Sequence, residues 1–167
     1  MTKNSTVHTI SQKTGENIIG AISAGAVFIL IGAIYVGTLP TSLWDKIVDF
    51  FQSFEIVKLS DTLSLPAPAT PGAHAVVYSA AFQFCIGLAI LQIIVLSLRI
   101  MWRSPVDKTS EAVGNLVYWF GACYLVPTFL NSATTQSTWF AFWAATITVI
   151  GISMIARAIV LFVRKRV

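Results

Sequence analysis

The polar residues of this chain that could carry chemistry lie inside long apolar runs and recur at a regular spacing. Four of them follow one another at intervals of seven residues: Tyr78, Cys85, Gln92 and Arg99. A later run places Thr146 and Ser153 at the same interval. Seven residues is the repeat of left-handed helix packing. We therefore expect a polar seam of Tyr78, Gln92, Thr146 and Ser153 between the helices of a four-helix bundle, held by side-chain hydrogen bonds.

A second interpretation gives some of these residues a ligand. Gln92, Arg99 and Arg157 could form a polar pocket near the inner membrane boundary, because arginines at span ends reach toward lipid headgroups. An anionic lipid or a small anion would suit such a pocket. The basic residues that could make this contact are Arg99, Arg103, Arg157 and Arg164.

The chain does not offer the residues that catalysis or a cofactor requires. Its only two histidines are His8 and His74, which flank the apolar runs, and those runs contain neither Asp nor Glu. Membrane haem needs inward-facing axial ligands, and a nucleophile needs a nearby base and an orienting group. The sequence therefore predicts no catalytic residue, no cofactor and no metal site.

Composition indicates an integral membrane protein of a single domain. Of 167 residues, 56% are hydrophobic and 11% are charged. So few charges cannot cover the surface of a soluble protein. The formal net charge of +4 does not indicate nucleic-acid binding, because the basic residues cluster at the ends of apolar runs.

The apolar runs predict an all-α fold with four transmembrane helices. Each run is close to the ~20 residues that cross a bilayer. The expected spans are residues 17–39, 74–98, 112–130 and 138–163, preceded by a flexible cytoplasmic tail over 1–13. The first span carries a stripe of small residues, Ala21, Gly25 and Gly32, of the kind that lets helices approach closely.

Residues 41–59 stand apart, because they are amphipathic. Their apolar residues follow a helical period, which predicts an interfacial helix on the outer face. One face of that helix would carry Leu43, Ile47, Phe50, Phe51 and Phe54, and could dock on a partner. Three prolines within six residues make the following connector, 60–72, extended.

The distribution of basic residues sets the predicted orientation. With four spans, nine of the eleven Lys and Arg fall on the side that holds both termini. The positive-inside rule then places both termini in the cytoplasm of a multi-pass protein of the cell membrane.

These features favour a non-catalytic tetraspan protein, a structural or accessory subunit of a larger membrane complex or of a homo-oligomer. Its expected partners are the lipid bilayer and other membrane subunits or further copies of itself, and not nucleic acid. The alternative is a small oligomeric channel or transporter. Its pathway would be lined by Gln83, Gln92, Asn115 and Thr146.

Overall fold

A computed structural model describes residues 3–59 and 62–166, with side chains placed over 14–59 and 62–163. Most of the described chain is helical. The long helices are α1 (Lys3–Gly37), α3 (Ala75–Met101), α4 (Val106–Phe129) and α5 (Gln136–Arg166). Four segments, each formed largely by one of these helices, are long and apolar enough to cross a membrane, namely Thr14–Gly37, Pro71–Met101, Val106–Phe129 and Gln136–Val163. The prediction of four such helices is confirmed.

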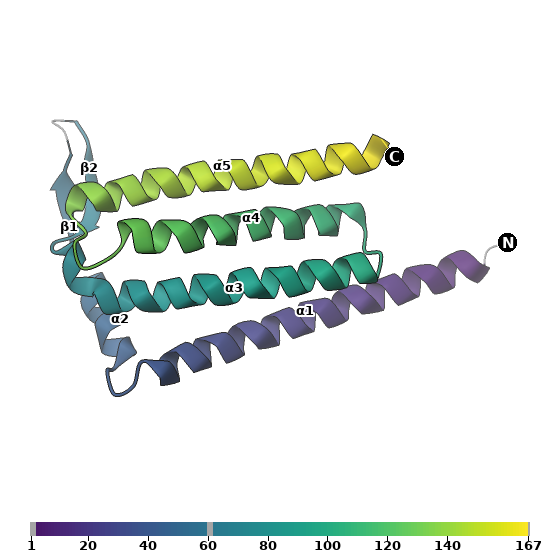
Figure 1. Ribbon diagram of the computed structural model, residues 1–167, viewed down its shortest axis with the longest axis horizontal. Coiled ribbons are helices and arrows are strands. Elements are labelled where there is room, and N and C mark those ends of the chain that lie inside the picture. The colour runs from purple at the N-terminus through teal and green to yellow at the C-terminus, as the bar shows by residue number, and fades with distance from the viewer. Residues whose placement is uncertain (1–2, 60–61, 167) are drawn as a thin grey trace.

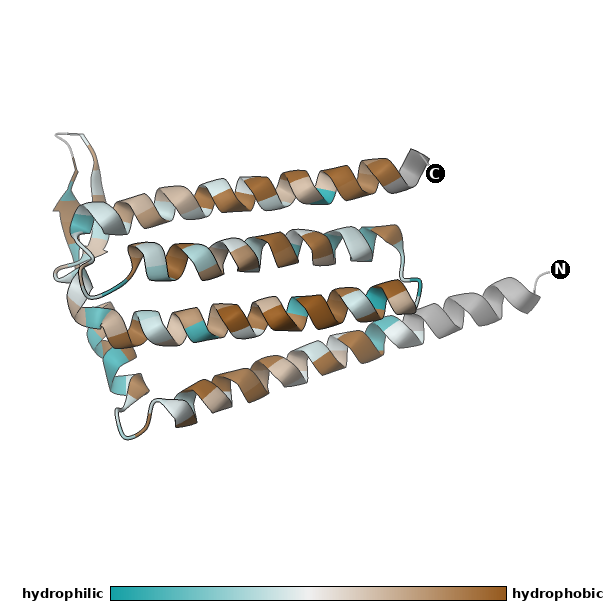
Figure 2. Cartoon of the chain, in the orientation of Figure 1, coloured by the Kyte–Doolittle hydropathy of each residue, from teal (hydrophilic) through white to brown (hydrophobic). Residues whose placement is uncertain are grey.

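The four long helices lie side by side in an open row, in the order α1, α3, α4, α5 (Figure 1). Among the described residues, extensive contacts join only neighbours in this row. The expectation of a four-helix bundle is wrong in this respect, because α1 and α5 form two separate edges. Apolar residues run along all four helices in Figure 2. An apolar medium would let such a row stay open, because its faces need no further protein cover.

The first helix begins earlier than expected. A flexible tail was predicted over 1–13, but α1 is helical from Lys3 onward. No glycine or proline interrupts the helix between Lys3 and Gly15, so the polar segment continues the helical backbone of the span. The prediction is wrong for residues 3–13.

A compact cap closes one end of the row. It consists of α2 (Leu43–Gln52), β1 (Phe54–Lys58), β2 (Ser64–Pro68) and the short 3₁₀ helix η1 (Pro71–His74). The predicted helix over 41–59 is therefore correct only in its first part. The helix ends at Gln52 and is capped by Ser53, whose backbone N–H donates to Asp49 O, and the chain then continues as a strand.

The strand forms because the proline-rich connector provides a partner for it. β1 and β2 pair antiparallel, with Phe54 opposite Pro68 and Lys58 opposite Ser64. Further backbone bonds close both ends of the hairpin, from Ala69 N to Ser53 O at 2.8 Å and from Leu59 N to Leu63 O at 2.9 Å. Prolines suit β2, because each strand of a two-stranded sheet is an edge strand. The cap thus adds a small sheet to a fold predicted as all-α.

Glycines mark where neighbouring helices pack closely. A side chain at Gly87 of α3 would meet Leu30 of α1, and one at Gly121 of α4 would meet Val149 of α5. The small residues of α1 are different, because a β-carbon at Gly25 or Gly32 would meet no atom within 4 Å. The small-residue stripe of the first span therefore faces away from the rest of the chain.

Candidate functional site

A polar groove lies between α1, α3 and α4 toward the end of the row opposite the cap. It encloses about 410 Å³. Its lining residues, which we call the Arg99 groove, are Glu16, Asn17, Ile19, Gly20, Ser23, Gln92, Val95, Arg99, Lys108 and Asn115. The antiparallel course of α1 and α3 creates it, since the early turns of α1 lie beside the last turns of α3 (Figure 1).

An ion pair closes the groove between α1 and α3. Arg99 Nη2 lies 3.9 Å from Glu16 Oε2, and the two side chains are only 15% and 21% exposed. Arg99 Nη1 also donates to the backbone carbonyl of Lys108 at the start of α4. One guanidinium thus links three helices, because its two terminal nitrogens face a different helix each.

The ion pair leaves two buried polar atoms without a hydrogen-bond partner. They are Nε of Arg99, a donor, and Oε1 of Glu16, an acceptor. An unsatisfied buried polar group costs about 1–3 kcal/mol. Native structures satisfy most such groups, so each exception requires an explanation. Here a donor and an acceptor are left open in the same groove.

Uncharged polar side chains continue the groove away from the ion pair. Gln92 lies seven residues before Arg99 on α3, which corresponds to about 10 Å along the helix. Asn115 lines the groove from α4, and Ser23 lines it from α1. The Ser23 hydroxyl donates to Ile19 O at 2.8 Å. The groove therefore runs from a charged end to an amide-lined stretch within the apolar part of the helices.

Basic residues predicted as anion contacts lie in different places. Arg99 and Gln92 line the groove together, whereas Arg157 is exposed on α5 beside Gly114 of α4. Arg103 lies in the turn after α3 with a positive φ of 49°. The side chain of Arg164 lies outside the described residues. The three-residue pocket of Gln92, Arg99 and Arg157 therefore does not form.

The residues of the predicted polar seam also lie apart from one another. Tyr78 lies at the cap end, where its hydroxyl donates to Pro71 O at 2.9 Å. Thr146 lines a small cavity of about 100 Å³ between α3, α4 and α5 and donates to Phe142 O. Ser153 donates to Ile150 O within its own helix. Backbone carbonyls of the chain thus satisfy these hydroxyls, and side-chain bonds between helices do not.

The residues of the alternative pathway do not line one passage. Gln92 and Asn115 share the Arg99 groove, while Thr146 belongs to the small cavity beside Cys85. Gln83 is exposed on α3. Among the described residues, the structure brings two of the four together.

The apolar face of the amphipathic segment is covered by the chain itself. The Phe50 ring makes edge contacts with the rings of Phe54, His74, Tyr78 and Trp139. A hydrogen-bond contact of 3.0 Å between Ser53 Oγ and His74 Nε2 joins α2 to η1. The cap is therefore fixed to the ends of α3 and α5. Of the proposed docking face, Phe51 remains 67% exposed.

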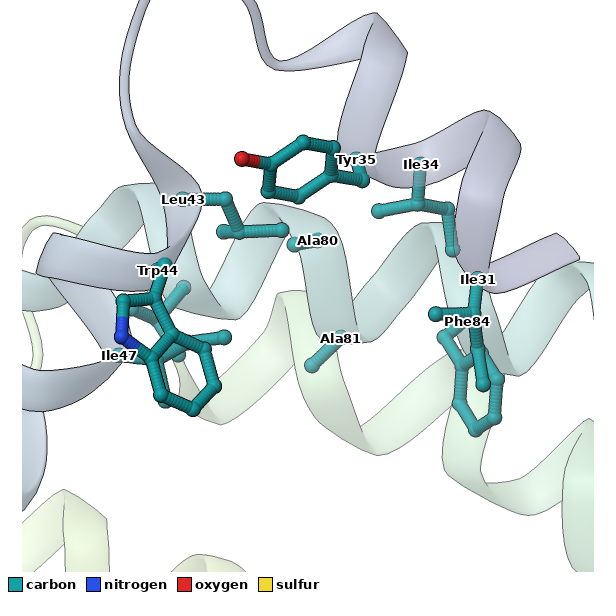
Figure 3. Close-up of a pocket in the computed structure, with 10 residues that line it drawn as sticks. Ile31, Ile34, Tyr35, Leu43, Trp44, Ile47, Ala80, Ala81 and Phe84 are labelled. Atoms are coloured by element: carbon teal, nitrogen blue, oxygen red, sulfur yellow. The ribbon is translucent and has the colours of Figure 1, made fainter. Parts of the chain in front are cut away.

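The start of α2 packs on the other side of the row. Leu43 is buried in a cluster with Ile34 of α1 and Ala80 of α3, and Ile47 packs against that cluster. An apolar cavity of about 390 Å³ lies where α1, α2 and α3 meet, and Figure 3 shows Trp44 of α2 at its side. The seam between α1 and α3 is thus hollow at both ends, apolar near the cap and polar at the Arg99 groove.

Sequence reasoning missed Glu16 and Lys108 as members of the groove. A signal for Glu16 was present. It precedes the first span directly, and Arg99 ends the second, so antiparallel spans place the two at a similar depth. For Lys108 the contributing atom is a backbone carbonyl, which any residue type supplies.

Comparison with known protein families, with curated proteins and with solved structures finds no match for this chain. Its function is therefore argued from its own geometry. The groove offers a guanidinium, a carboxylate and amides, which are groups that bind and orient a ligand. The exposed face of α1 offers small residues without a packing partner.

Proposed function

We propose that this chain is a non-catalytic tetraspan membrane protein that acts by lateral assembly, as a structural or accessory subunit of a larger complex or of a homo-oligomer. The observation that carries the proposal is the open row of helices, in which α3 is the only long helix with extensive contacts to α1 among the described residues. An edge helix of this kind keeps one side free of protein neighbours.

The free side of α1 has the composition of a helix-packing surface. It carries Ala21, Gly25, Phe28, Ile29 and Gly32, all exposed. Small residues let two backbones approach closely in a membrane, and this drives helix association where hydrophobic burial gives no advantage. The glycines that pack inside the chain, Gly87 and Gly121, act in this way toward α1 and α5. Gly25 and Gly32 of α1 are equivalent in kind, and a β-carbon at either would meet no atom within 4 Å.

The proposal places the four spans in the cell membrane with both termini in the cytoplasm. The support is the excess of Lys and Arg at the ends and turns opposite the cap. The cap then lies on the outer face. Because Leu43, Phe50 and Phe54 of the expected docking face pack within the chain, we move the docking surface from residues 41–59 to α1.

The test is to purify the tagged full-length chain gently from native membranes and to measure the mass of what is recovered. Wild type should elute in an assembly larger than one chain. A double change, Gly25→Leu and Gly32→Leu, should release the single chain while leaving its fold intact, because nothing in the chain lies within 4 Å of either added β-carbon.

Gly151→Leu provides the matched control. Gly151 lies on α5, at the other edge of the row, and its added β-carbon also meets no atom within 4 Å. This variant should keep the assembly. Recovery of wild type as a single chain, or loss of the assembly in Gly151→Leu alone, would contradict the proposal.

A further inference from the structure

The Arg99 groove brings a guanidinium and a carboxylate together at one end. Nε of Arg99 and Oε1 of Glu16 are both buried and both without a partner. Nη1 donates to the Lys108 carbonyl, and Nη2 lies at an ion-pair distance of 3.9 Å from Glu16 Oε2. A ligand that complements this pair of charges carries one acceptor and one donor.

A simple anion supplies only half of this requirement. It would accept from Arg99 but would lie against the Glu16 carboxylate, and like charges repel at close range. A simple cation would meet the opposite difficulty at Arg99. A dipolar group that carries a phosphate at one end and an N–H or O–H donor at the other satisfies both atoms. Its charges would alternate with those of the protein.

The surroundings of the ion pair suit a phospholipid in particular. Beyond the charged end, Ser23 and Gly20 leave room beside α1, and the Gln92 and Asn115 amides can donate to ester carbonyls. Ile19 and Val95 provide apolar walls on α1 and α3. The groove thus combines a charged end with amides deeper among the membrane-crossing helices, a position that a lipid reaches from within the bilayer.

We propose that the Arg99 groove binds a phospholipid whose headgroup carries a hydrogen-bond donor, with the phosphate on Arg99 and an ammonium or hydroxyl group on Glu16. Phosphatidylethanolamine has this chemistry. Phosphatidylcholine is the control lipid, because methylation of the same headgroup removes every N–H donor from it. The inference uses the proposed membrane placement but is independent of lateral assembly.

The test uses the full-length chain in mild detergent with equal amounts of phosphatidylethanolamine and phosphatidylcholine, and native mass spectrometry counts the lipid that each protein ion retains. Wild type should favour phosphatidylethanolamine by roughly tenfold, the effect of one charge-assisted hydrogen bond. Equal retention of the two lipids would overturn the proposal, and is what an ion pair that only joins α1 to α3 would give.

Two variants test the phosphate contact at Arg99 and the donor contact at Glu16 separately. Arg99→Gln should lose both lipids, whereas Glu16→Gln should keep lipid and bring the two toward equal retention. Arg157→Gln removes the same charge from an exposed site outside the groove and should behave as wild type. If Glu16→Gln retained the full preference, or if Arg157→Gln lost lipid as Arg99→Gln does, the assignment would be wrong.

A final arm distinguishes a lipid from a soluble metabolite with the same headgroup. Soluble phosphoethanolamine, added at the concentration of the lipid, should not displace it, because it lacks the acyl chains that would pack on the apolar surface of the spans. Displacement by the soluble headgroup would overturn the lipid assignment. A single chain that retains phosphatidylethanolamine would support this inference while contradicting the proposed assembly, so the two can fail separately.

Discussion

Arg99 shows how one side chain can define a site in an otherwise apolar chain. It ends α3, pairs with Glu16 of α1 and donates to the backbone at the start of α4. Breaking a buried ion pair is costly because the remaining charge is left uncompensated. The sequence indicated the Arg99 and Gln92 parts of this groove from their heptad spacing. It did not show which acid would pair with Arg99, because that choice depends on how α1 packs on α3.

Tyr78 is a residue whose role can be tested without disturbing the groove. Its ring is buried at the cap end, and its hydroxyl donates to Pro71 O at 2.9 Å. Tyr78→Phe should lower the free energy of unfolding by about 1 kcal/mol, the net value of a buried hydrogen bond. Thermal unfolding in detergent measures it. Tyr35→Phe, at an exposed position, should leave stability unchanged, and an equal loss in both variants would contradict this role for Tyr78.

At the scale of elements, local patterns predicted the long helices but not the cap. Apolar runs near 20 residues identify spans because a single segment satisfies its own backbone hydrogen bonds in lipid only as a helix. Residues 41–59 also follow a helical period, yet the chain turns to a strand at Phe54. β1 pairs with β2, which follows it in the chain, and the prolines of β2 argued against a strand there. The residue pattern of 41–59 alone gives no information about that contact.

The side of α2 that faces the spans should govern the stability of the cap. Phe50 contacts four rings outside its own helix, those of Phe54, His74, Tyr78 and Trp139. Phe50→Ala should therefore cost about 2–4 kcal/mol of unfolding free energy. Denaturation in detergent, followed by tryptophan fluorescence, reports it because Trp139 lies in this cluster.

Phe51→Ala is the matched control for that measurement. Phe51 belongs to the same helix but is exposed, so its removal should cost much less than that of Phe50. A larger loss of stability in Phe51→Ala than in Phe50→Ala would mean that α2 presents its other face to the spans.

At the scale of the whole molecule, the two ends of the helix row differ, because the cap lies at one end only. This difference allows an orientation in the membrane to be proposed. Basic residues gather at the turn after α3, at the start of α1 and at the end of α5, whereas four of the seven Asp and Glu lie in the sequence between α1 and α3. Length and composition alone were enough to predict four spans. They could not predict the row, because which helices touch depends on close packing at Gly87, Gly114 and Gly121.

Cysteine labelling in intact cells tests this orientation. With Cys85 and Cys123 replaced by alanine, Glu55→Cys in β1 should react with a membrane-impermeant maleimide added outside. Asp107→Cys at the start of α4 should react only after the membrane is opened. Both positions are exposed, so burial does not account for a difference. The reverse pattern would invert the proposed topology.

Photo-crosslinking from α1 in native membranes tests the central claim, lateral assembly, most directly. A photoreactive amino acid in place of Phe28, which is 75% exposed, should give a discrete protein adduct heavier than the chain. The same photoreactive amino acid in place of Leu30, which packs on Gly87 of α3, should crosslink within the chain. This variant is the positive control for the photochemistry. Adducts with lipid alone at position 28, beside efficient internal crosslinking at position 30, would contradict the claim that this chain assembles through α1.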